Sequence, residues 1–557
     1  MKLDRRTLLV GGAALGGAST AFAETRNIGG GRGHARALSE LARYVEQHRT
    51  DWGLPGMTVC AVDRDGYSGF ITSGYANLER RTPVNADHVF QVGSITKMIV
   101  ALAAYQMMQE GKLRADAKLS ALMPELNVRD GGDITLQHLL NHTSGLPADA
   151  PVIGEAGLWS GYAPGSHWSY SNTGYDIIGL ILERTDNALL AEILERRVLR
   201  PLAMNASYGA IRTGDRLRYA QGYESLNNER LPFRPGPMAQ ASWVDVDRGA
   251  GCVASTVGDM AKFLRYLLTL AAGEGAPVLS NEYAQRFLAA AADAPGWADG
   301  AKYGNGIARV TSDERLYLHH TGGMVSFCSA LHVDAAAGVA VWASTNTSYM
   351  QLSYRPRAIT LQGCRLLASA RGGPAVLPAA PTRARLEHPE VFVNTYTAAD
   401  GDNFEIVADG DQIKMRREGR VSDMQPVGPY FACREPKFEL LGLMFEIDKD
   451  KAVRAWSFDV EYLAAGQSGY KPAAPAALRA LAGRYDNDDR WLSPTYVVAR
   501  DGKLLMNNSD VLVALPDGAY RIGEDDWSPE RVRFDGVING RPTRMLISGV
   551  PFVRRFS

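Results

Sequence analysis

The sequence predicts an α/β protein in which one antiparallel sheet lies between helices, followed by two small antiparallel β-barrels. Strand-like runs occur near both ends of residues 24–370, with a long, mainly helical stretch between them. Two later segments of similar length, residues 387–466 and 467–557, are dense in alternating strand-like runs. Stretches rich in Pro, Ala and Gly, including a predicted linker at 371–386, separate these parts, as is common at domain boundaries.

The first part, residues 24–370, is expected to fold around strands from both of its ends. Its expected elements are a helix at 35–48, strands at 56–63 and 66–74, a mainly helical stretch to about residue 305, strands at 315–320, 323–334 and 338–345, and a helix at 358–368. The strands most simply pair in one antiparallel sheet. We expect the terminal helices on one face and the helical stretch on the other, with the active site between the sheet and the helical region.

The two C-terminal segments are predicted to be related barrels. Each carries an Asp-Gly turn between strand-like runs, at Asp409-Gly410 and at Asp501-Gly502, which is the usual signal of a hairpin. Aligning Tyr396 with Tyr485 gives a repeat of about 89 residues. Repeated short strands of this kind predict small antiparallel barrels.

Residues 1–23 have the pattern of an export signal. A short basic start precedes a weakly apolar Gly/Ala/Leu stretch with a small-x-small ending, Ala21-Phe22-Ala23. The stretch is too short and too rich in glycine to span about 30 Å of hydrocarbon. The adjacent Arg5 and Arg6 resemble the twin-arginine signal of bacterial export, and an ordinary secretory signal is the alternative. We therefore expect a periplasmic mature chain that begins near Glu24.

Composition limits the classes of function. The 557 residues include 60 Lys and Arg against 61 Asp and Glu, a balance that gives no reason to expect nucleic acid or an anionic membrane as partner. No segment after residue 23 has about 18 consecutive apolar residues, so we expect no transmembrane segment in the mature chain. We expect no cofactor and no metal, and the oligomeric state stays open. The cysteines are scattered and odd in number, which argues against a disulfide scaffold or a zinc site: Cys60, Cys252, Cys328, Cys364 and Cys433.

One lysine stands in the apolar run "FQVGSITKMIVALAAYQMMQ", residues 90–109. Lys97 is its only charged residue, and the run predicts a helix buried on nearly every side. Ser94 lies three positions earlier, so the two side chains share one helix face. Burial can lower a lysine pKa by about 3–5 units, and such a lysine can relay the proton of a neighbouring serine nucleophile. The same S-x-x-K spacing occurs at Ser468 and Lys471, but in a linker.

Two further segments are candidates for the same site. Tyr170-Ser171-Asn172 precedes an amphipathic helix; the phenol can exchange a proton with a serine oxygen, and the Asn172 amide offers a donor and an acceptor. His320-Thr321-Gly322-Gly323 follows a strand, and its glycines let a ligand approach the sheet edge closely. A backbone N–H there can join that of Ser94 in stabilising an oxyanion. A packed tyrosine in a capping turn is the alternative for the first segment, because Y-x-N also occurs at Tyr75/Asn77 and Tyr485/Asn487.

Together these pieces resemble the penicillin-recognising serine hydrolases, which include class C β-lactamases, D-alanyl-D-alanine carboxypeptidases, D-aminopeptidases and β-lactamase-like esterases. Their motif order is S-x-x-K, then Y-x-N, then K-T-G or H-x-G, and it matches Ser94/Lys97, Tyr170/Asn172 and His320/Thr321/Gly322. The stretches "LQHLLNHTSGLP" and "PGSHWSYSNTGY" are also typical of this family. The resemblance covers about residues 35–370 and implies a β-lactamase/transpeptidase-like sandwich with a helical subdomain.

The resemblance also implies a role for each residue. Ser94 is the acylated nucleophile, and Lys97 and Tyr170 share proton transfer, with the choice of base between them open. Asn172 orients the substrate amide. The remaining roles are substrate contact by His320, Thr321 and Gly322, and an oxyanion hole formed by the N–H groups of Ser94 and Gly323.

The expected function is that of an exported peptidase or amidase on small substrates or short peptides that contain D-amino acids. Histidine at position 320, where efficient class C β-lactamases carry lysine, resembles carboxypeptidases and D-aminopeptidases, and the latter also carry two barrels. The alternatives are a β-lactamase-like esterase or weak β-lactamase, and a slowly acylating penicillin-binding sensor that uses its barrels to hold a cell-wall fragment. We expect a barrel loop to close one side of the cleft. His138 and His142 are expected to hydrogen-bond near a helix end rather than bind a metal.

Overall fold

The computed structural model describes residues 23–226, 236–348, 355–373, 386–428 and 430–555. The predicted export signal lies outside the described residues except for Ala23, and so does most of the predicted linker at 371–386. Within the described ranges, no helix combines the length and the apolar character that crossing a membrane requires.

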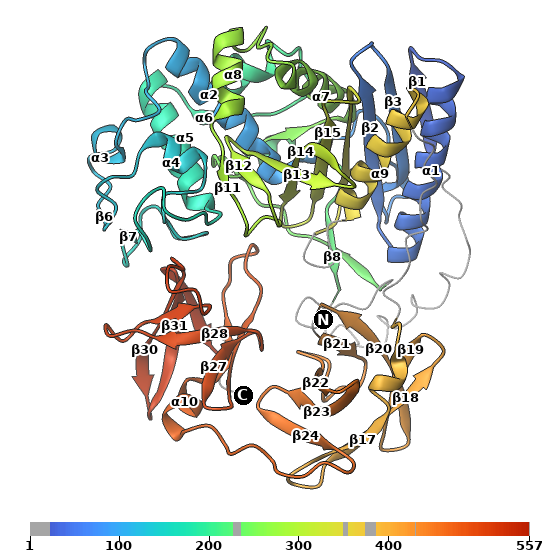
Figure 1. The fold of residues 1–557 in the computed structure, drawn as a ribbon, viewed down its shortest axis with the longest axis vertical. Coiled ribbons are helices and arrows are strands. Elements are labelled where there is room, and N and C mark those ends of the chain that lie inside the picture. Colours follow the sequence, from blue (N-terminus) through green and yellow to red (C-terminus); the bar gives the residue numbers. More distant parts are fainter. Residues whose placement is uncertain (1–22, 227–235, 349–354, 374–385, 429, 556–557) are drawn as a thin grey trace, which may run out of the picture.

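One antiparallel sheet organises the N-terminal part of the chain (Figure 1). Its strand order is β1-β3-β2-β16-β15-β14-β13-β12-β11, and β4 pairs with β3. Strand β2 (Gly56–Asp63) pairs along its length with β16 (Val339–Thr345), which confirms the predicted pairing of strands from the two ends. The other strands are β1 (Glu24–Ile28), β3 (Ser68–Asn77), β4 (Thr82–Pro83), β11 (Ala292–Asp293), β12 (Lys302–Gly304), β13 (Ile307–Ser312), β14 (Arg315–Gly323) and β15 (Cys328–Asp334).

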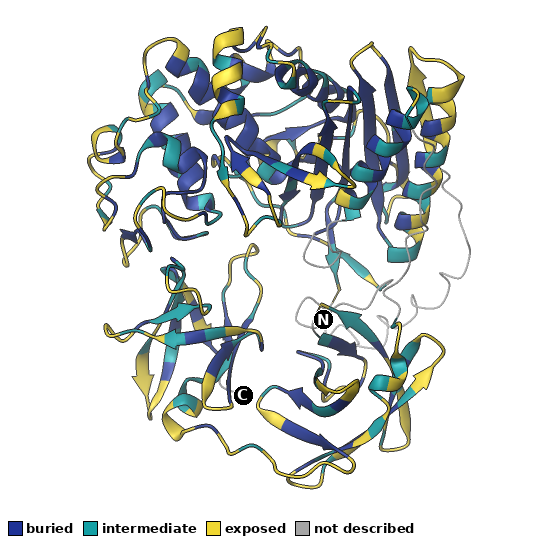
Figure 2. Cartoon of the chain, viewed as in Figure 1, coloured by how far each residue is buried: buried dark blue, intermediate teal, exposed yellow. Residues whose placement is uncertain are grey.

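The central strands are largely buried (Figure 2), and successive residues belong to different layers. On β2, Val59 and Ala61 belong to the core formed with α1 (Arg32–Trp52) and α9 (Arg355–Ala370), and Cys60 and Val62 belong to the core of the helical region. A strand covered on both faces needs apolar residues at successive positions, which explains the run "MTVCAV". The terminal helices therefore lie on one face and the helical stretch on the other, as predicted.

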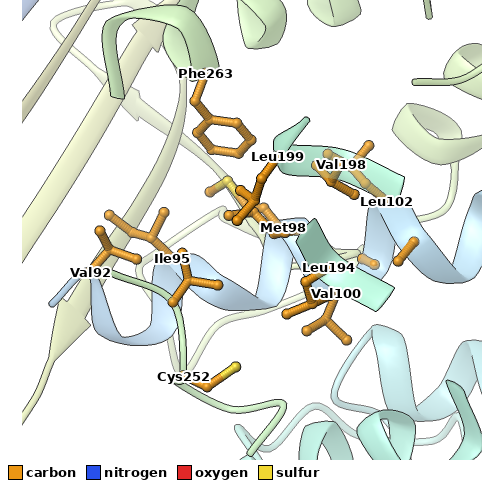
Figure 3. Packing of buried hydrophobic residues seen from close by; sticks show 14 of the residues in the cluster. Val92, Ile95, Met98, Val100, Leu102, Leu194, Val198, Leu199, Cys252 and Phe263 are labelled. Atoms are coloured by element: carbon orange, nitrogen blue, oxygen red, sulfur yellow. The ribbon is translucent and has the colours of Figure 1, made fainter. Parts of the chain in front are cut away.

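The helical region is built around α2 (Thr96–Gln109), in which nearly every side chain is buried. Figure 3 shows Met98 and Val100 of this helix close to Leu194 and Leu199. The other helices and helical turns here are η1 (Gly93–Ile95), α3 (Leu119–Leu122), α4 (Leu136–Leu140), α5 (Asn172–Asp186), α6 (Leu190–Leu194), η2 (Glu195–Leu199), η3 (Thr213–Arg218), α7 (Val257–Ala271) and α8 (Asn281–Ala289). Short strands lie among them: β5 (Phe90–Gln91), β6 (Val128–Arg129), β7 (Leu158–Trp159), β8 (Tyr223–Ser225), β9 (Met238–Gln240) and β10 (Ala254–Ser255).

The sheet differs from the prediction in several strands. The strand expected at 323–334 begins only at Cys328, because Gly323 ends β14 and the Met324 N–H donates to the Phe327 carbonyl in a turn. Strands β1, β4, β11, β12 and β13 were not expected, and the last three lie next to β14 where the helical stretch was predicted to end. All five residues of β1 are exposed, so its sequence lacks the apolar alternation by which a strand is recognised.

The first C-terminal barrel is an eight-stranded antiparallel sheet in the order β21-β20-β19-β18-β17-β24-β23-β22. Its end strands are joined by an isolated bridge between Phe431 and Leu443, so the barrel is nearly closed. It comprises η5 (Pro389–Val391), β17 (Asn394–Ala398), β18 (Asn403–Asp409), β19 (Gln412–Arg417), β20 (Arg420–Val427), β21 (Tyr430–Cys433), β22 (Met444–Asp448), β23 (Lys451–Ser457) and β24 (Val460–Ala464).

The second barrel is closed and lies beside the first, on the same side of the α/β domain (Figure 1). It comprises α10 (Ala476–Leu481), β25 (Gly483–Asp486), β26 (Thr495–Arg500), β27 (Lys503–Met506), β28 (Asp510–Ala514), β29 (Tyr520–Ile522), β30 (Arg531–Ile538), β31 (Arg541–Ile547) and β32 (Val550–Arg554).

Each barrel has a buried tyrosine whose hydroxyl makes the same kind of hydrogen bond. Tyr396 and Tyr485 lie fully buried in the first strand of each barrel. Each hydroxyl donates to the carbonyl four residues earlier, of Phe392 at 2.8 Å and of Leu481 at 2.7 Å. The two Asp-Gly turns join β18 to β19 and β26 to β27, as predicted from the hairpin signal.

Candidate active site

Ser94 lies in the helical turn η1, between β5 and α2. Gly93 before it has φ +57°, in the left-handed region that favours glycine, and a Cβ there would lie 2.8 Å from the backbone N of Gly323. A Cβ on Gly322 would lie 1.9 Å from the carbonyl O of Val92. Gly93 and Gly322 therefore let strand β14 approach the serine's own turn, a use that the sequence did not predict.

Lys97 lies one turn further on, fully buried, with its Nζ 3.2 Å from Ser94 Oγ. The same Nζ donates to Asn172 Oδ1 at 2.6 Å and to the Ala250 carbonyl at 2.8 Å. A protonated amine has three N–H donors, so each donor has an acceptor here. The lysine predicted to be buried is therefore fully hydrogen-bonded, by partners 75 and 153 positions away in the sequence.

Burial dominates the ionisation of Lys97. It lowers the pKa of the amine to about 7, while the carboxylates of Asp176 and Asp149 oppose this change. Burial also raises the pKa of Asp176 to about 6, and its Oδ1 accepts the Ala250 N–H at 3.0 Å. About half of an amine with a pKa near 7 lacks its proton at pH 7, and this neutral form can accept the proton of a serine hydroxyl.

Tyr170 lies beside this amine, with its ring centroid 4.9 Å from Lys97 Nζ. The ring belongs to an aromatic cluster, in which its centroid lies 4.3 Å from that of His142, 6.1 Å from that of Trp297 and 6.4 Å from that of Tyr303. The fold thus brings together Tyr170, Lys97 and Ser94, and their catalytic roles stay a prediction.

Asn172 begins α5, where the Ser171 hydroxyl caps the helix by accepting the Gly174 N–H at 3.0 Å. While its Oδ1 accepts from Lys97, its Nδ2 donates to Asp149 Oδ1 at 2.8 Å. Sequence reasoning missed three groups that surround the amine, namely Asp149, Asp176 and the Ala250 carbonyl. Only Asp176 had a local signal, since it lies four residues after Asn172 on the same helix face.

The substrate-binding residues predicted on β14 lie at the end of that strand, where Thr321, Gly322 and Gly323 pair with β15. The close contact between Gly93 and Gly323 brings the N–H-bearing segments of Ser94 and Gly323 together. Two converging N–H groups are what an oxyanion hole needs. The oxyanion role of these two residues stays a prediction.

His320 is buried, and both of its ring nitrogens are occupied by protein groups. Nδ1 lies against the Thr321 carbonyl, and Nε2 lies 2.8 Å from the Tyr303 hydroxyl. A carbonyl only accepts, so Nδ1 carries the proton and Nε2 accepts from the tyrosine. Burial holds the pKa of His320 well below its usual value, with the Lys97 charge adding to this effect. A direct hydrogen bond from His320 to substrate, as the resemblance implies, would require it to leave one of these partners.

The other two histidines make the local hydrogen bonds that the sequence predicted. His138 Nδ1 accepts the Thr135 N–H at 3.2 Å in the cap of α4, and His142 Nδ1 accepts the Ser171 N–H at 3.1 Å. Among the described residues, no group of three or more His, Cys, Asp or Glu could hold a metal ion. All five cysteines are buried free thiols.

The second S-x-x-K spacing lies far from this environment. Ser468 is exposed, and Lys471 pairs with Asp501 at 2.6 Å and with Glu446 at 3.4 Å. These carboxylates keep the pKa of Lys471 above its usual value, so the amine stays protonated. The buried helix around Lys97 is therefore what distinguishes the two occurrences, as the sequence predicted.

A pocket is lined by residues of the α/β domain and by one residue of the second barrel. It encloses about 300 Å³, including open solvent, and its lining includes Gln91, Trp243, Ser326 and, from the second barrel, Trp491. Gln91 lies three residues before Ser94 in the chain, and Ser326 lies in the turn that follows β14. Trp491, between β25 and β26, thus reaches a pocket whose lining includes sequence neighbours of Ser94 and β14 but none of the predicted site residues.

Known proteins resemble the part of the chain that holds this site. The family model described as Beta-lactamase matches residues 41–363. The β-lactamase of Escherichia coli (strain K12) is 27% identical over 235 residues, which are 40% of this chain and 58% of that protein. Esterase EstB of Burkholderia gladioli is 28% identical over 331 residues, which are 50% of this chain and 83% of the esterase. The chain spans between 51% and 58% of the length of the first three curated relatives.

Two solved structures share the fold. The octameric penicillin-binding protein homologue from Pyrococcus abyssi has a TM-score of 0.51 and 20% identity, over 76% of this chain and 99% of that one. The D-amino acid amidase from Ochrobactrum anthropi SV3, in complex with L-phenylalanine amide, has a TM-score of 0.50 and 21% identity, over 61% of this chain and 100% of that one. Since the family model matches more than half of its residues, this chain belongs to the beta-lactamase family of serine hydrolases.

Proposed function

We propose that this chain is an exported hydrolase that forms an acyl-enzyme on Ser94 and acts on small amides or short peptides of D-amino acids. The observation that carries the proposal is the buried amine of Lys97, whose Nζ lies 3.2 Å from Ser94 Oγ and whose pKa is lowered to about 7. A serine with such a neighbour can become a nucleophile at neutral pH. The exported location rests on the pattern of the first 23 residues.

In the first step, Ser94 Oγ attacks the substrate carbonyl carbon and its proton passes to Lys97 Nζ. The carbonyl oxygen gains the displaced electron pair, and the N–H groups of Ser94 and Gly323 stabilise the resulting oxyanion. Collapse of the tetrahedral intermediate breaks the bond to the leaving amine, which takes a proton through Tyr170 or Lys97. Water then attacks the Ser94 ester, and the reverse proton transfers release the acid and restore the serine.

One observation argues against efficient β-lactam hydrolysis, and another concerns the size of the substrate. His320 is held neutral, so this position lacks the charge of the lysine that efficient class C β-lactamases carry there. The pocket lined by Trp243 and Trp491 is shared with the second barrel, which supports the prediction that a barrel loop limits substrate size. The match to a D-amino acid amidase supports amides as the substrate class, at the level of the fold.

Ester hydrolysis is the second candidate, because the match to Esterase EstB extends over 83% of that protein. An activated serine attacks an ester and an amide by the same route, and the two reactions differ in how much the leaving group needs a proton. A slowly acylating binding protein is distinguished from both by its turnover.

The first prediction is that acylation occurs at one serine. A fluorophosphonate or fluorescent penicillin should label the wild type and the matched control Ser468→Ala, but not Ser94→Ala. Labelling that persists in Ser94→Ala would refute the assignment.

A panel of D-amino-acid amides, D-Ala-D-Ala peptides, cephalosporins and p-nitrophenyl esters then identifies the substrate. We expect the highest kcat/KM for a D-amino-acid amide or peptide. A burst of about one product per enzyme without further turnover would instead support the binding protein.

A further inference from the structure

One loop of the second barrel packs against the segment that precedes Asn172 in the sequence. It comprises residues 523–530, between β29 and β30. Trp527 stacks on His167 with ring centroids 4.8 Å apart, and the Pro529 carbonyl accepts the Trp159 Nε1–H at 2.8 Å. A Cβ on Gly161 would lie 2.5 Å from Pro529 Cα, so the two backbones are in close contact. This docking loop therefore fits tightly against the segment that leads to Asn172.

Glu530 ends the docking loop with a hydrogen bond to each domain. Its Oε1 accepts the N–H of Ala148 at 2.7 Å, and its Oε2 accepts the hydroxyl of Ser548 at 2.5 Å. Desolvation raises the pKa of this carboxyl, the two hydrogen bonds oppose the change, and the charges of Asp149 and Arg531 act in opposite directions. A carboxylate between two domains is costly to desolvate unless it is hydrogen-bonded, so these contacts define a specific geometry.

Ala148, whose N–H donates to Glu530, is also hydrogen-bonded to the start of α5. The Ala148 carbonyl accepts the N–H groups of Asn172 at 2.8 Å and Thr173 at 3.1 Å. The Pro147 carbonyl accepts the Ser171 hydroxyl at 2.7 Å. The next residue, Asp149, accepts from Asn172 Nδ2, and Asn172 Oδ1 accepts from Lys97. An unbroken series of hydrogen bonds thus joins the second barrel to the amine beside Ser94.

We propose that Glu530 is a positioning residue for the Lys97–Asn172 pair, which makes the second barrel part of the catalytic apparatus. By fixing residues 147–149, it holds Asn172 and Asp149 against the buried amine. The inference rests on the proposed roles of Ser94 and Lys97. Displacement of a positioned group by about 1 Å can slow a reaction by about 10- to 100-fold, so loss of this contact should be measurable.

The test compares Glu530→Ala, Glu530→Gln and Glu155→Gln in the full chain. Glu155 is the matched control because it lies at the same interface. Its side chain is exposed, and its carboxylate makes a long ion pair with Arg544, at 3.7 Å. Glu530→Ala should lower the acylation rate by about 10-fold or more. Both Asn172 and Asp149 favour the ammonium form of Lys97, so their displacement should also move the acidic limb of the pH profile to lower pH. Glu530→Gln keeps an acceptor for the Ala148 N–H and should retain the wild-type acylation rate and pH profile. Glu155→Gln should change neither the rate nor the profile.

Amide hydrogen exchange gives a readout that does not depend on catalysis. Peptides that contain residues 147–150 should exchange faster in Glu530→Ala than in the wild type or in Glu155→Gln. Unchanged exchange and an unchanged pH profile in a folded Glu530→Ala would overturn the inference. If this variant does not fold, Glu530→Asp, which is too short to reach both partners, decides by the same two readouts. A wild type that is not acylated at Ser94 would refute the proposed function, and the exchange result would still report on the positioning.

Discussion

A charged amine can be buried at Lys97 because three acceptors surround it and the charge is only marginally stable. Ser94 Oγ, Asn172 Oδ1 and the Ala250 carbonyl receive its three hydrogens when it is protonated. Desolvation lowers its pKa to about 7, so removal of the proton near neutral pH costs little. The neutral amine keeps two donors for Asn172 and Ala250 and turns its lone pair toward Ser94.

The lowered pKa of Lys97 predicts that the acylation rate depends on pH. Only the neutral amine can accept the Ser94 proton, so kcat/KM should rise about tenfold per pH unit below the pKa of Lys97 and level off above about pH 7. The carboxylate of Asp176 stabilises the ammonium form, so Asp176→Asn should shift this limb to lower pH. Stopped-flow acylation rates between pH 5 and 9 would check both, and a limb that stays in place in Lys97→Met would exclude Lys97 as its source.

At the scale of elements, regular patterns and the pairing of β2 with β16 were predictable, and single hydrogen-bond partners from distant segments were not. Strand β2 matches the predicted residues 56–63, because a strand buried on both faces has a continuous apolar run bounded by polar and glycine residues. Ser94, Lys97, Tyr170 and Asn172 could be proposed from the sequence because their motifs are short and ordered. The Ala250 carbonyl and Glu530 carry no such signal, since a backbone acceptor has no residue type and Glu530 acts across 382 positions of sequence.

The packing of β14 against η1 gives a prediction at this scale. Gly322→Ala would bring a Cβ to 1.9 Å from the Val92 carbonyl O and 2.6 Å from Ser329 Oγ, so the strand must move away from the serine's turn. Overpacking of this kind costs about 1–3 kcal/mol, and displacement of the neighbouring Gly323 N–H should slow acylation by about 10-fold or more.

The matched control is Gly258→Ala in α7, where a Cβ would meet no atom within 4 Å. Alanine is favoured over glycine inside a helix by about 1 kcal/mol, so this variant should be at least as stable as the wild type and equally active. Thermal unfolding and labelling rates would check both variants. A Gly322→Ala protein with wild-type stability and rate would show that η1 and β14 are not in the close contact described.

At the scale of the whole molecule, the second barrel contacts both the α/β domain and the first barrel. The second barrel contributes Trp491 to the pocket and Glu530 to the segment behind Asn172. The first barrel contacts the second, since the Tyr430 hydroxyl donates to the Asn507 carbonyl and Lys471 joins Glu446 to Asp501. We infer that the first barrel supports the second, which limits access to the site.

The last prediction therefore concerns a chain that ends after residue 373 and lacks both barrels. The central sheet and α9 are complete by then, and the Arg371–Asp63 ion pair is retained, so this shortened chain should fold and still be labelled at Ser94. Labelling should be about 10-fold slower or more, because Glu530 no longer holds residues 147–149. Larger peptides and esters should be accepted, because Trp491 no longer borders the pocket.

Full-length Trp491→Ala separates the effect on rate from the effect on substrate size: it should accept the same larger substrates at a wild-type acylation rate. If both proteins keep the wild-type size preference, the barrels do not limit the substrate, and an insoluble shortened chain would show that the α/β domain needs them to fold.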